Sequence, residues 1–135
     1  MSPENVEQLI RRATDAYNRR DADGMLEEWA PDGVVDWSNA RTFEAGVYRG
    51  HDEIRAFMEG FRAAWEEVRI EIVDGPVEVE DGLWMLENVT YMQGRDGIKV
   101  QARSAWLITI KDGMQTSLTL YQTKQEALEA AGIEE

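Results

Sequence analysis

The sequence predicts an α+β fold in which helices pack on one face of a curved antiparallel sheet. Three observations support this prediction. Apolar residues recur at helical spacing in the first half of the chain, and they alternate with polar residues in the second half. Asp-Gly pairs at residues 81–82, 96–97 and 112–113 separate the alternating segments, as in tight hairpins. Strands joined by such short turns run antiparallel, so a parallel βαβ sheet is disfavoured.

Helices are expected where apolar stripes coincide with start and stop signals. Ser2 and Pro3 suit the N-cap and first position of the first helix. Gly50 breaks the chain before the third helix. Thr123 and Glu126 have the spacing of a capping box ahead of the last helix. The expected helices cover residues 2–17, 21–29, 51–68 and 123–132.

Strands are expected where the apolar period falls to two. They cover residues 34–37, 43–48, 69–73, 77–79, 83–92, 98–110 and 114–121. In the sixth of these, alternation places Ser104 and Trp106 on the face toward the helices. In the seventh it places Thr116 and Leu118 there and Gln115 on the opposite face. For residues 83–92 the pattern alone does not show which face of the strand is directed toward the helices.

Composition and charge bound the function. The length of 135 residues predicts one domain over residues 1–135. A net charge of −13 repels phosphate backbones and anionic membranes, so no nucleic-acid or membrane partner is expected. Without cysteine and with one histidine, neither a metal nor an organic cofactor is predicted. The first residues lack the pattern of a signal peptide and no apolar run is long enough to span a membrane, so a cytoplasmic location is expected.

Two segments resemble the SnoaL-like family. They are Glu44-Ala45-Gly46-Val47-Tyr48-Arg49-Gly50-His51 and the stretch from Tyr121 to Gly132, and the order of elements is similar over almost the whole chain. The resemblance implies the cone-shaped α+β barrel of the nuclear-transport-factor-like superfamily. Its members include polyketide cyclases, ketosteroid isomerases and limonene-epoxide hydrolases. Those enzymes carry out chemistry in a pocket between the helices and the concave sheet face, and they are commonly dimers.

The catalytic sets of these relatives do not carry over to this chain. The positions of the isomerase tyrosine and two aspartates fall at Ala13, Trp37 and Trp106. The positions used by epoxide hydrolases and cyclases fall near Trp84, Leu86 and Leu120. The resemblance therefore implies the fold and leaves the activity open.

The resemblance also implies which residues line the pocket. They are Tyr17, Trp37, Asn39, Trp84, Leu86, Asn88, Thr90, Ser104, Trp106, Thr116, Leu118 and Leu120. This aromatic wall with a few neutral polar groups suits an uncharged, flat or apolar ligand. Alternatively, the tryptophans simply fill the barrel. Asn88 and Thr90 could donate hydrogen bonds to a carbonyl or enolate oxygen, or they could bond each other or water.

Two side chains are weak catalytic candidates. His51 is the single histidine of the chain, and histidine often serves as a general base, but its place at the entry to the third helix favours a turn or capping role. Asp36 would become a plausible base if it were buried in the pocket. Alternation with an inward Trp37 points Asp36 outward instead.

Two functions remain open from the sequence. The first is an enzyme that acts on a small apolar carbonyl compound by isomerase, cyclase or lyase chemistry with proton transfer. The second is a non-catalytic module that binds a hydrophobic small molecule. A carboxylate or histidine inside the pocket would favour the enzyme. A homodimer is also predicted, because the convex face combines polar residues with an apolar set. That apolar set is Leu83, Met85, Val89, Tyr91, Leu107 and Tyr121.

Overall fold

The computed structural model describes residues 2–40 and 45–133. The helices are α1 (Pro3–Asn18), α2 (Ala22–Leu26), α3 (Gly50–Ala64) and α4 (Lys124–Ala130). The strands are β1 (Trp29–Asp36), β2 (Val47–Arg49), β3 (Glu67–Glu80), β4 (Leu83–Gln93), β5 (Lys99–Lys111) and β6 (Met114–Tyr121). The extended segment expected at residues 43–48 lies partly outside the described residues, and β2 covers only its last part.

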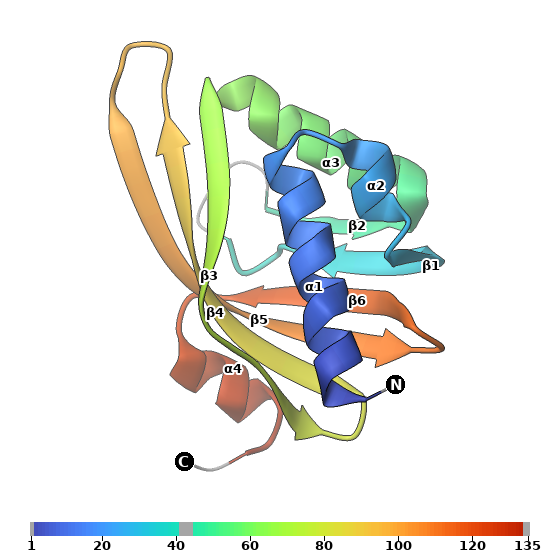
Figure 1. Ribbon diagram of the computed structural model, residues 1–135. Coiled ribbons are helices and arrows are strands. Elements are labelled where there is room, and N and C mark those ends of the chain that lie inside the picture. Colours follow the sequence, from blue (N-terminus) through green and yellow to red (C-terminus); the bar gives the residue numbers. More distant parts are fainter. Residues whose placement is uncertain (1, 41–44, 134–135) are drawn as a thin grey trace.

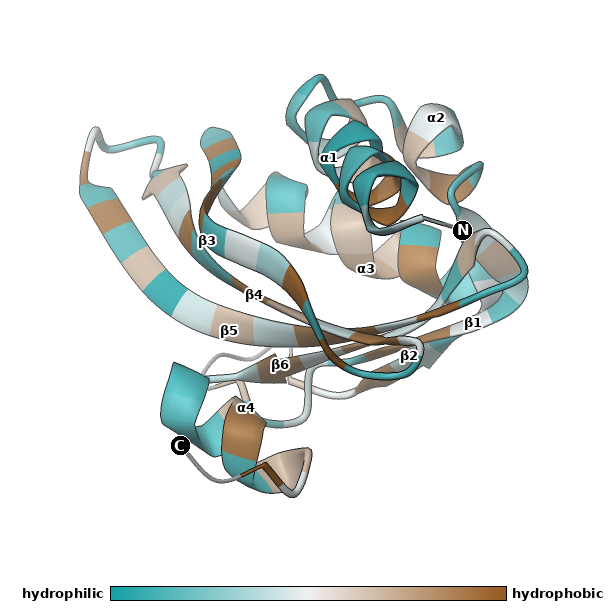
Figure 2. Ribbon diagram, turned by 60° about the horizontal axis from the view of Figure 1, so that its bottom comes forward, coloured by the Kyte–Doolittle hydropathy of each residue, from teal (hydrophilic) through white to brown (hydrophobic). Residues whose placement is uncertain are grey.

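The six strands form one curved sheet in the order β2-β1-β6-β5-β4-β3. All neighbours pair antiparallel except β1 and β6, which run parallel. Helices α1, α2 and α3 lie on the concave side, whereas α4 lies on the opposite side (Figures 1 and 2). The predicted α+β fold with helices on a curved sheet is therefore confirmed.

Helix α1 is anchored at both ends by caps. The side chain of Ser2 accepts a hydrogen bond from the backbone of Asn5 at 3.2 Å. At the other end, the amide of Asp21 bonds the carbonyl of Ala16 at 2.9 Å, as in a Schellman motif. This motif places Arg20 at the position that usually holds glycine, with φ of 62°. The buried face of α1 packs against the concave side of the sheet.

Strand β3 is continuous where two shorter strands are predicted. It passes through Gly75 and Pro76, and its pairing with β4 shifts around them. Gly75 has φ of +84°, and a Cβ atom there would lie 2.7 Å from the carbonyl oxygen of Met85. A side chain at this position would collide with the neighbouring strand, so glycine lets β3 bend and still pair.

A bulge in β6 reverses the predicted faces of two residues. Thr109 pairs with Ser117 and Ile110 pairs with Gln115, so the ladder skips Thr116. The extra residue shifts the alternation by one position. As a result Gln115, predicted on the convex face, is buried on the concave side, where it lines the central cavity.

Helix α4 covers part of the convex face of the sheet, a contact that the sequence did not predict. A second core cluster forms there from Met85, Ala105, Leu107, Ala127 and Leu128. Leu83 and Tyr121 pack against the same cluster. Most of the apolar set from which a dimer interface is predicted is therefore covered within the chain itself, because the last helix folds back onto the sheet (Figure 2).

Candidate functional site

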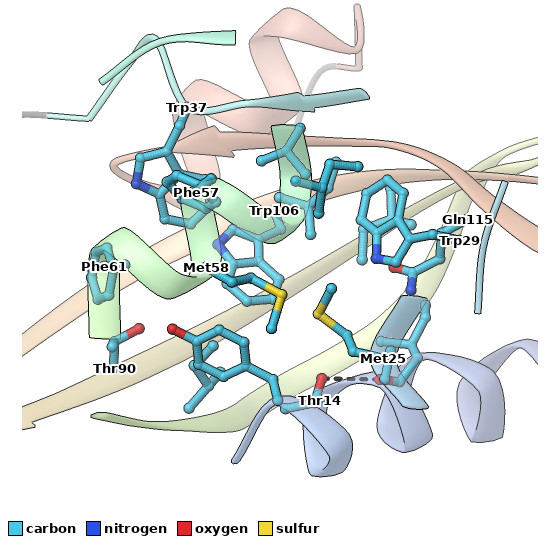
Figure 3. Close-up of a pocket in the computed structure, with 18 residues that line it drawn as sticks. Thr14, Met25, Trp29, Trp37, Phe57, Met58, Phe61, Thr90, Trp106 and Gln115 are labelled. Carbon is cyan, nitrogen blue, oxygen red and sulfur yellow. Dashed lines mark hydrogen bonds between the residues drawn. The ribbon is translucent and has the colours of Figure 1, made fainter. Parts of the chain in front are cut away.

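A cavity of about 90 Å³ lies between the three N-terminal helices and the concave face of the sheet (Figure 3). Its wall is almost wholly apolar. The lining residues are Ile10, Ala13, Thr14, Tyr17, Met25, Trp29, Val35, Trp37, Ile54, Phe57, Met58, Phe61, Ile70, Thr90, Trp106, Ile108, Gln115 and Leu118. An engineered apolar cavity of about 150 Å³ holds benzene, so this cavity has room for part of one ring as it stands.

Aromatic rings from α3, from β5 and from the residue after β1 form one side of the cavity. The ring centroids of Trp37 and Trp106 are 6.1 Å apart in an edge-to-face arrangement, and those of Trp37 and Phe57 are 5.3 Å apart. Phe57 also contacts Tyr48 and Phe61. Each ring lies against at least one other, so the wall presents flat surfaces with fixed directions.

Two buried nitrogen atoms of this wall lack hydrogen-bond acceptors. They are Nε1 of Trp106 and Nε2 of Gln115, neither of which has a partner among the described residues. Both residues line the cavity, and Gln115 is only 2% exposed. A buried donor without an acceptor costs about 1–3 kcal/mol. These two groups are therefore the features of the wall that packing alone does not account for.

Tyr17 contributes a third polar group. Its hydroxyl forms no hydrogen bond with the described part of the chain, and its ring lies 4.3 Å from the guanidinium carbon of Arg62. Burial raises the pKa of Tyr17 to about 12, and the charge of Arg62 opposes part of that rise. The hydroxyl is therefore protonated at neutral pH and can donate a hydrogen bond.

The structure divides the predicted pocket residues into two groups. Tyr17, Trp37, Thr90, Trp106 and Leu118 line the cavity. The others do not line it: they are Asn39, Trp84, Leu86, Asn88, Ser104, Thr116 and Leu120.

Asn88 belongs to a hydrogen-bond network below the cavity wall. It is completely buried, and its Nδ2 donates to Oγ of Ser104 at 3.1 Å. Its Oδ1 accepts from the hydroxyl of Thr90 at 3.3 Å. The sequence allowed Asn88 and Thr90 either to bond a ligand oxygen or to bond each other. The structure shows the bond between the two side chains. Trp84, Leu86 and Leu120 are likewise core residues rather than cavity residues.

Asn39 and Thr116 also bond the protein itself. The exposed Asn39 donates to the carbonyl of Leu120 at 2.9 Å and ties the segment after β1 to the end of β6. Thr116, the bulge residue, bonds the hydroxyl of Thr109 at 2.6 Å. The bulge is the reason that Thr116 misses the cavity and Gln115 reaches it.

The two catalytic candidates lie outside the cavity lining. Val35 and Trp37 point inward, so Asp36 lies on the other face, where it accepts two hydrogen bonds from Ser38. There burial raises the pKa of Tyr121, and the Asp36 carboxylate raises it further. His51 lies in the first turn of α3 and its Nε2 is 3.0 Å from the carbonyl oxygen of Trp29. Since a carbonyl only accepts, this nitrogen donates and joins α3 to β1.

The cavity lining contains no aspartate, glutamate or histidine among residues 2–40 and 45–133. In the same part of the chain, no group of three or more such side chains has the arrangement of a metal site. Tyr17 is thus the titratable group of the lining. What the site can do is bind an apolar surface and donate neutral hydrogen bonds.

A second concavity, of about 480 Å³, lies beyond Arg62, at the ends of α1 and α3. It was not predicted from the sequence. Arg20, Arg62, Arg69 and Lys99 line it, with Glu67 as the acidic residue of the lining. Arg20 and Arg62 each lie near the end of a helix, α1 and α3. Only the folded structure shows that these two helix ends are neighbours, so the sequence alone does not indicate this site.

Comparisons with known proteins relate this architecture to one family. The sequence matches the family described as SnoaL-like domain over residues 10–118. No curated protein gives a significant match. No helix in the described ranges has both the length and the apolar character that crossing a membrane requires.

Solved structures share the fold over nearly the whole chain. A putative polyketide cyclase from Xanthomonas campestris is 19% identical with a TM-score of 0.75, covering 94% of this chain and 96% of its own. Ketosteroid isomerase from a Mycobacterium species is 17% identical with a TM-score of 0.74, covering 90% and 95%. A Mycobacterium tuberculosis protein in complex with estradiol-17β-hemisuccinate is 14% identical with a TM-score of 0.76, also covering 90% and 95%. Identities this low concern the fold alone.

Proposed function

The chain belongs to the family of SnoaL-like domains, and on this premise we propose that it binds a small, largely apolar molecule carrying a carbonyl oxygen in its central cavity. The observation that carries the proposal is the pair of buried donors without acceptors, Trp106 Nε1 and Gln115 Nε2. A carbonyl oxygen is an acceptor, so its binding would offset the cost of leaving such a donor unbonded.

The shape of the cavity limits the ligand. A volume of about 90 Å³ is below the usual size of a ligand pocket, which is on the order of 300–1,000 Å³. Met25 and Met58 reach into the cavity and have unbranched, adaptable side chains (Figure 3). Their movement would admit a single-ring compound. The flat faces of Trp37 and Trp106 suit such a ring.

Catalysis by proton transfer is the second candidate function. It is supported by the Tyr17 hydroxyl, which stays protonated at neutral pH and can donate to an enolate oxygen. No carboxylate or imidazole faces the cavity from the described residues to remove a proton from carbon. A carboxylate or histidine inside the pocket would favour an enzyme, and the described lining has neither. Binding without isomerase, cyclase or lyase chemistry is therefore the better supported function.

A matched pair of ligands tests the binding proposal. Acetophenone and α-methylstyrene have the same shape, but the second replaces the carbonyl oxygen by a methylene group. We expect acetophenone to bind more tightly by about 0.5–1.5 kcal/mol and to shift the indole N–H resonance of Trp106 in NMR spectra. In Trp106→Phe the preference for acetophenone should fall, and in Trp106→Phe/Gln115→Leu it should disappear. Trp84→Phe, which alters a buried tryptophan outside the lining, should keep it.

Equal affinity for the two ligands would refute the role of the donors. Absence of binding by both at millimolar concentration would mean that the tryptophans fill the barrel. The catalytic candidate is tested in the same samples by exchange of the acetophenone methyl protons in D2O. Exchange faster than in buffer, and lost in Tyr17→Phe, would favour an enzyme.

The predicted homodimer and the cytoplasmic location stay predictions. Helix α4 covers Met85 and Leu107, so a dimer would have to use the part of the convex face that carries Val89 and Tyr91. Sedimentation at micromolar concentration distinguishes a dimer from a monomer.

A further inference from the structure

The second concavity has a charge opposite to that of the protein. The chain carries a net charge of −13, yet Arg20, Arg62, Arg69 and Lys99 face this space against the single carboxylate of Glu67. Of these four cations, Arg69 forms an ion pair with Glu71 at 3.4 Å. The other three have no carboxylate within 4.0 Å among the described residues, which leaves a local excess of positive charge.

Arg20 and Arg62 come together because α1 and α3 end beside each other and beside the start of β3 (Figure 1). Arg62, from the last turn of α3, donates to the carbonyl of Tyr17 and lies over its ring. Arg20 donates to the carbonyl of Glu66 at 2.8 Å. Nε of Arg62 is buried and has no acceptor within the described ranges. The two guanidiniums are close enough that the charge of Arg20 contributes to lowering the pKa of Arg62, although burial is the larger cause.

Arg20 stands at a helix end where glycine is more common. With φ of 62°, it occupies a left-handed conformation that glycine or asparagine adopts at lower cost. For most other residues the conformation costs on the order of 1 kcal/mol. The side chain of Arg20 lines the same space as that of Arg62.

The arginine pair adjoins the central cavity. Tyr17 lines that cavity with one part of its side chain, and the guanidinium of Arg62 rests on its ring. Phe61, the neighbour of Arg62 in α3, lines the cavity as well. We propose that Arg20 and Arg62 bind a carboxylate at one end of a ligand whose apolar part lies in the central cavity. The inference rests on the proposed function and specifies its ligand class as a small aromatic or aliphatic acid.

The net negative charge does not prevent such binding. At physiological ionic strength charges are screened over about 8 Å, so distant carboxylates contribute little at the site. Two adjacent guanidiniums present several donors in planar forks that match carboxylate oxygens. The local pair therefore determines the affinity for an anion.

The test uses two probes that differ in charge alone. 3-Phenylpropanoate carries a carboxylate, and 3-phenylpropanamide is its neutral counterpart with the same ring and chain. We expect the wild-type protein to bind the acid about tenfold more tightly than the amide in calorimetric titrations. In Arg20→Gln the preference should fall several-fold, and in Arg20→Gln/Arg62→Gln it should vanish, while affinity for the amide stays the same.

Three variants make the result interpretable. Arg20 is exposed, so Arg20→Gln keeps the fold even if the double variant does not. Arg62→Lys retains the charge and should keep part of the preference. Lys111→Gln removes an equal charge from the exposed end of β5 and should leave the preference intact.

The outcomes separate this inference from the proposed function. Equal binding of acid and amide, unchanged in the arginine variants, would overturn the carboxylate site and leave the cavity as a ligand site. In that case the two arginines serve only to bond the carbonyls of Tyr17 and Glu66. Binding of neither probe by a protein that binds acetophenone would overturn the carboxylate site alone, whereas failure to bind any of the three compounds would overturn both proposals.

Discussion

Two buried amides on the concave side of the sheet should respond in opposite ways to the same substitution. Gln115 is 2% exposed and its Nε2 has no acceptor in the part of the chain that the structure describes, whereas Asn88 is fully buried and bonded to Ser104 and Thr90. Leucine has roughly the volume of either side chain and no polar atoms. We expect Gln115→Leu to stabilise the protein and Asn88→Leu to destabilise it.

The magnitudes follow from the hydrogen bonds. Removing an unbonded buried donor recovers part of its desolvation cost of about 1–3 kcal/mol, so Gln115→Leu should gain about 1 kcal/mol. Asn88→Leu leaves the hydroxyls of Ser104 and Thr90 without their partner and should lose roughly 1–3 kcal/mol. The double variant Asn88→Leu/Ser104→Ala should recover part of that loss, because one of the unpartnered hydroxyls is gone.

Urea unfolding followed by tryptophan fluorescence measures both effects. With a slope of about 1.5–2 kcal/mol/M, a change of about 1 kcal/mol moves the midpoint by about 0.5–0.7 M. A loss of stability in Gln115→Leu comparable to that of Asn88→Leu would refute the reasoning. It would mean that the Gln115 amide is part of the core and not a donor kept for a ligand. Weaker acetophenone binding by the stabilised variant would support the site.

Two further predictions concern Tyr17 and Gly75. The pKa of Tyr17 is raised from 10 to about 12, so the folded state holds a proton that the unfolded chain has lost between these values. Stability should therefore fall as pH rises from about 10 to 12, and in absorbance titrations at 295 nm Tyr17→Phe should remove a late-ionising tyrosine. Gly75→Ala should cost about 2 kcal/mol or more, because it combines φ of +84° with a contact of 2.7 Å to the carbonyl of Met85. Gly60→Ala, in α3 with open space around it, should gain about 0.5–1 kcal/mol; a loss of stability there, or none at Gly75, would contradict this account.

Local chemistry explains why most elements could be predicted. The Asp-Gly turns end long alternating runs, and the strands β4, β5 and β6 begin and end close to the predicted residues. Ser2 and Thr123 cap the helices that follow them, as their positions indicate. In these segments propensity, spacing and turn residues all favour the same structure.

The site was harder to predict because single-residue shifts decide it. The bulge at Thr116 depends on pairing between β5 and β6, and the sequence contains no signal that distinguishes it from regular alternation. Gly75 and Pro76 are typical of a break, yet β3 continues through them because β4 supports the bend. The apolar spacing predicts Trp29 at the end of a helix, but this residue begins β1. The Arg20–Arg62 pair required the relative placement of two helices, which a linear pattern does not contain.

The position of β6 in the sheet has a consequence for how the chain acquires its structure. This strand joins the β1–β2 pair to the β3–β5 meander, and Val35 pairs with Leu118 from the other end of the chain. During synthesis β6 leaves the ribosome after β1–β5, so until then no strand joins the β1–β2 pair to the β3–β5 meander. Contacts between distant segments slow folding, typically to times on the order of milliseconds to seconds. The cavity therefore closes late, once β6 has emerged and paired, and Trp29 of β1 remains open to chaperones and to other chains until that moment.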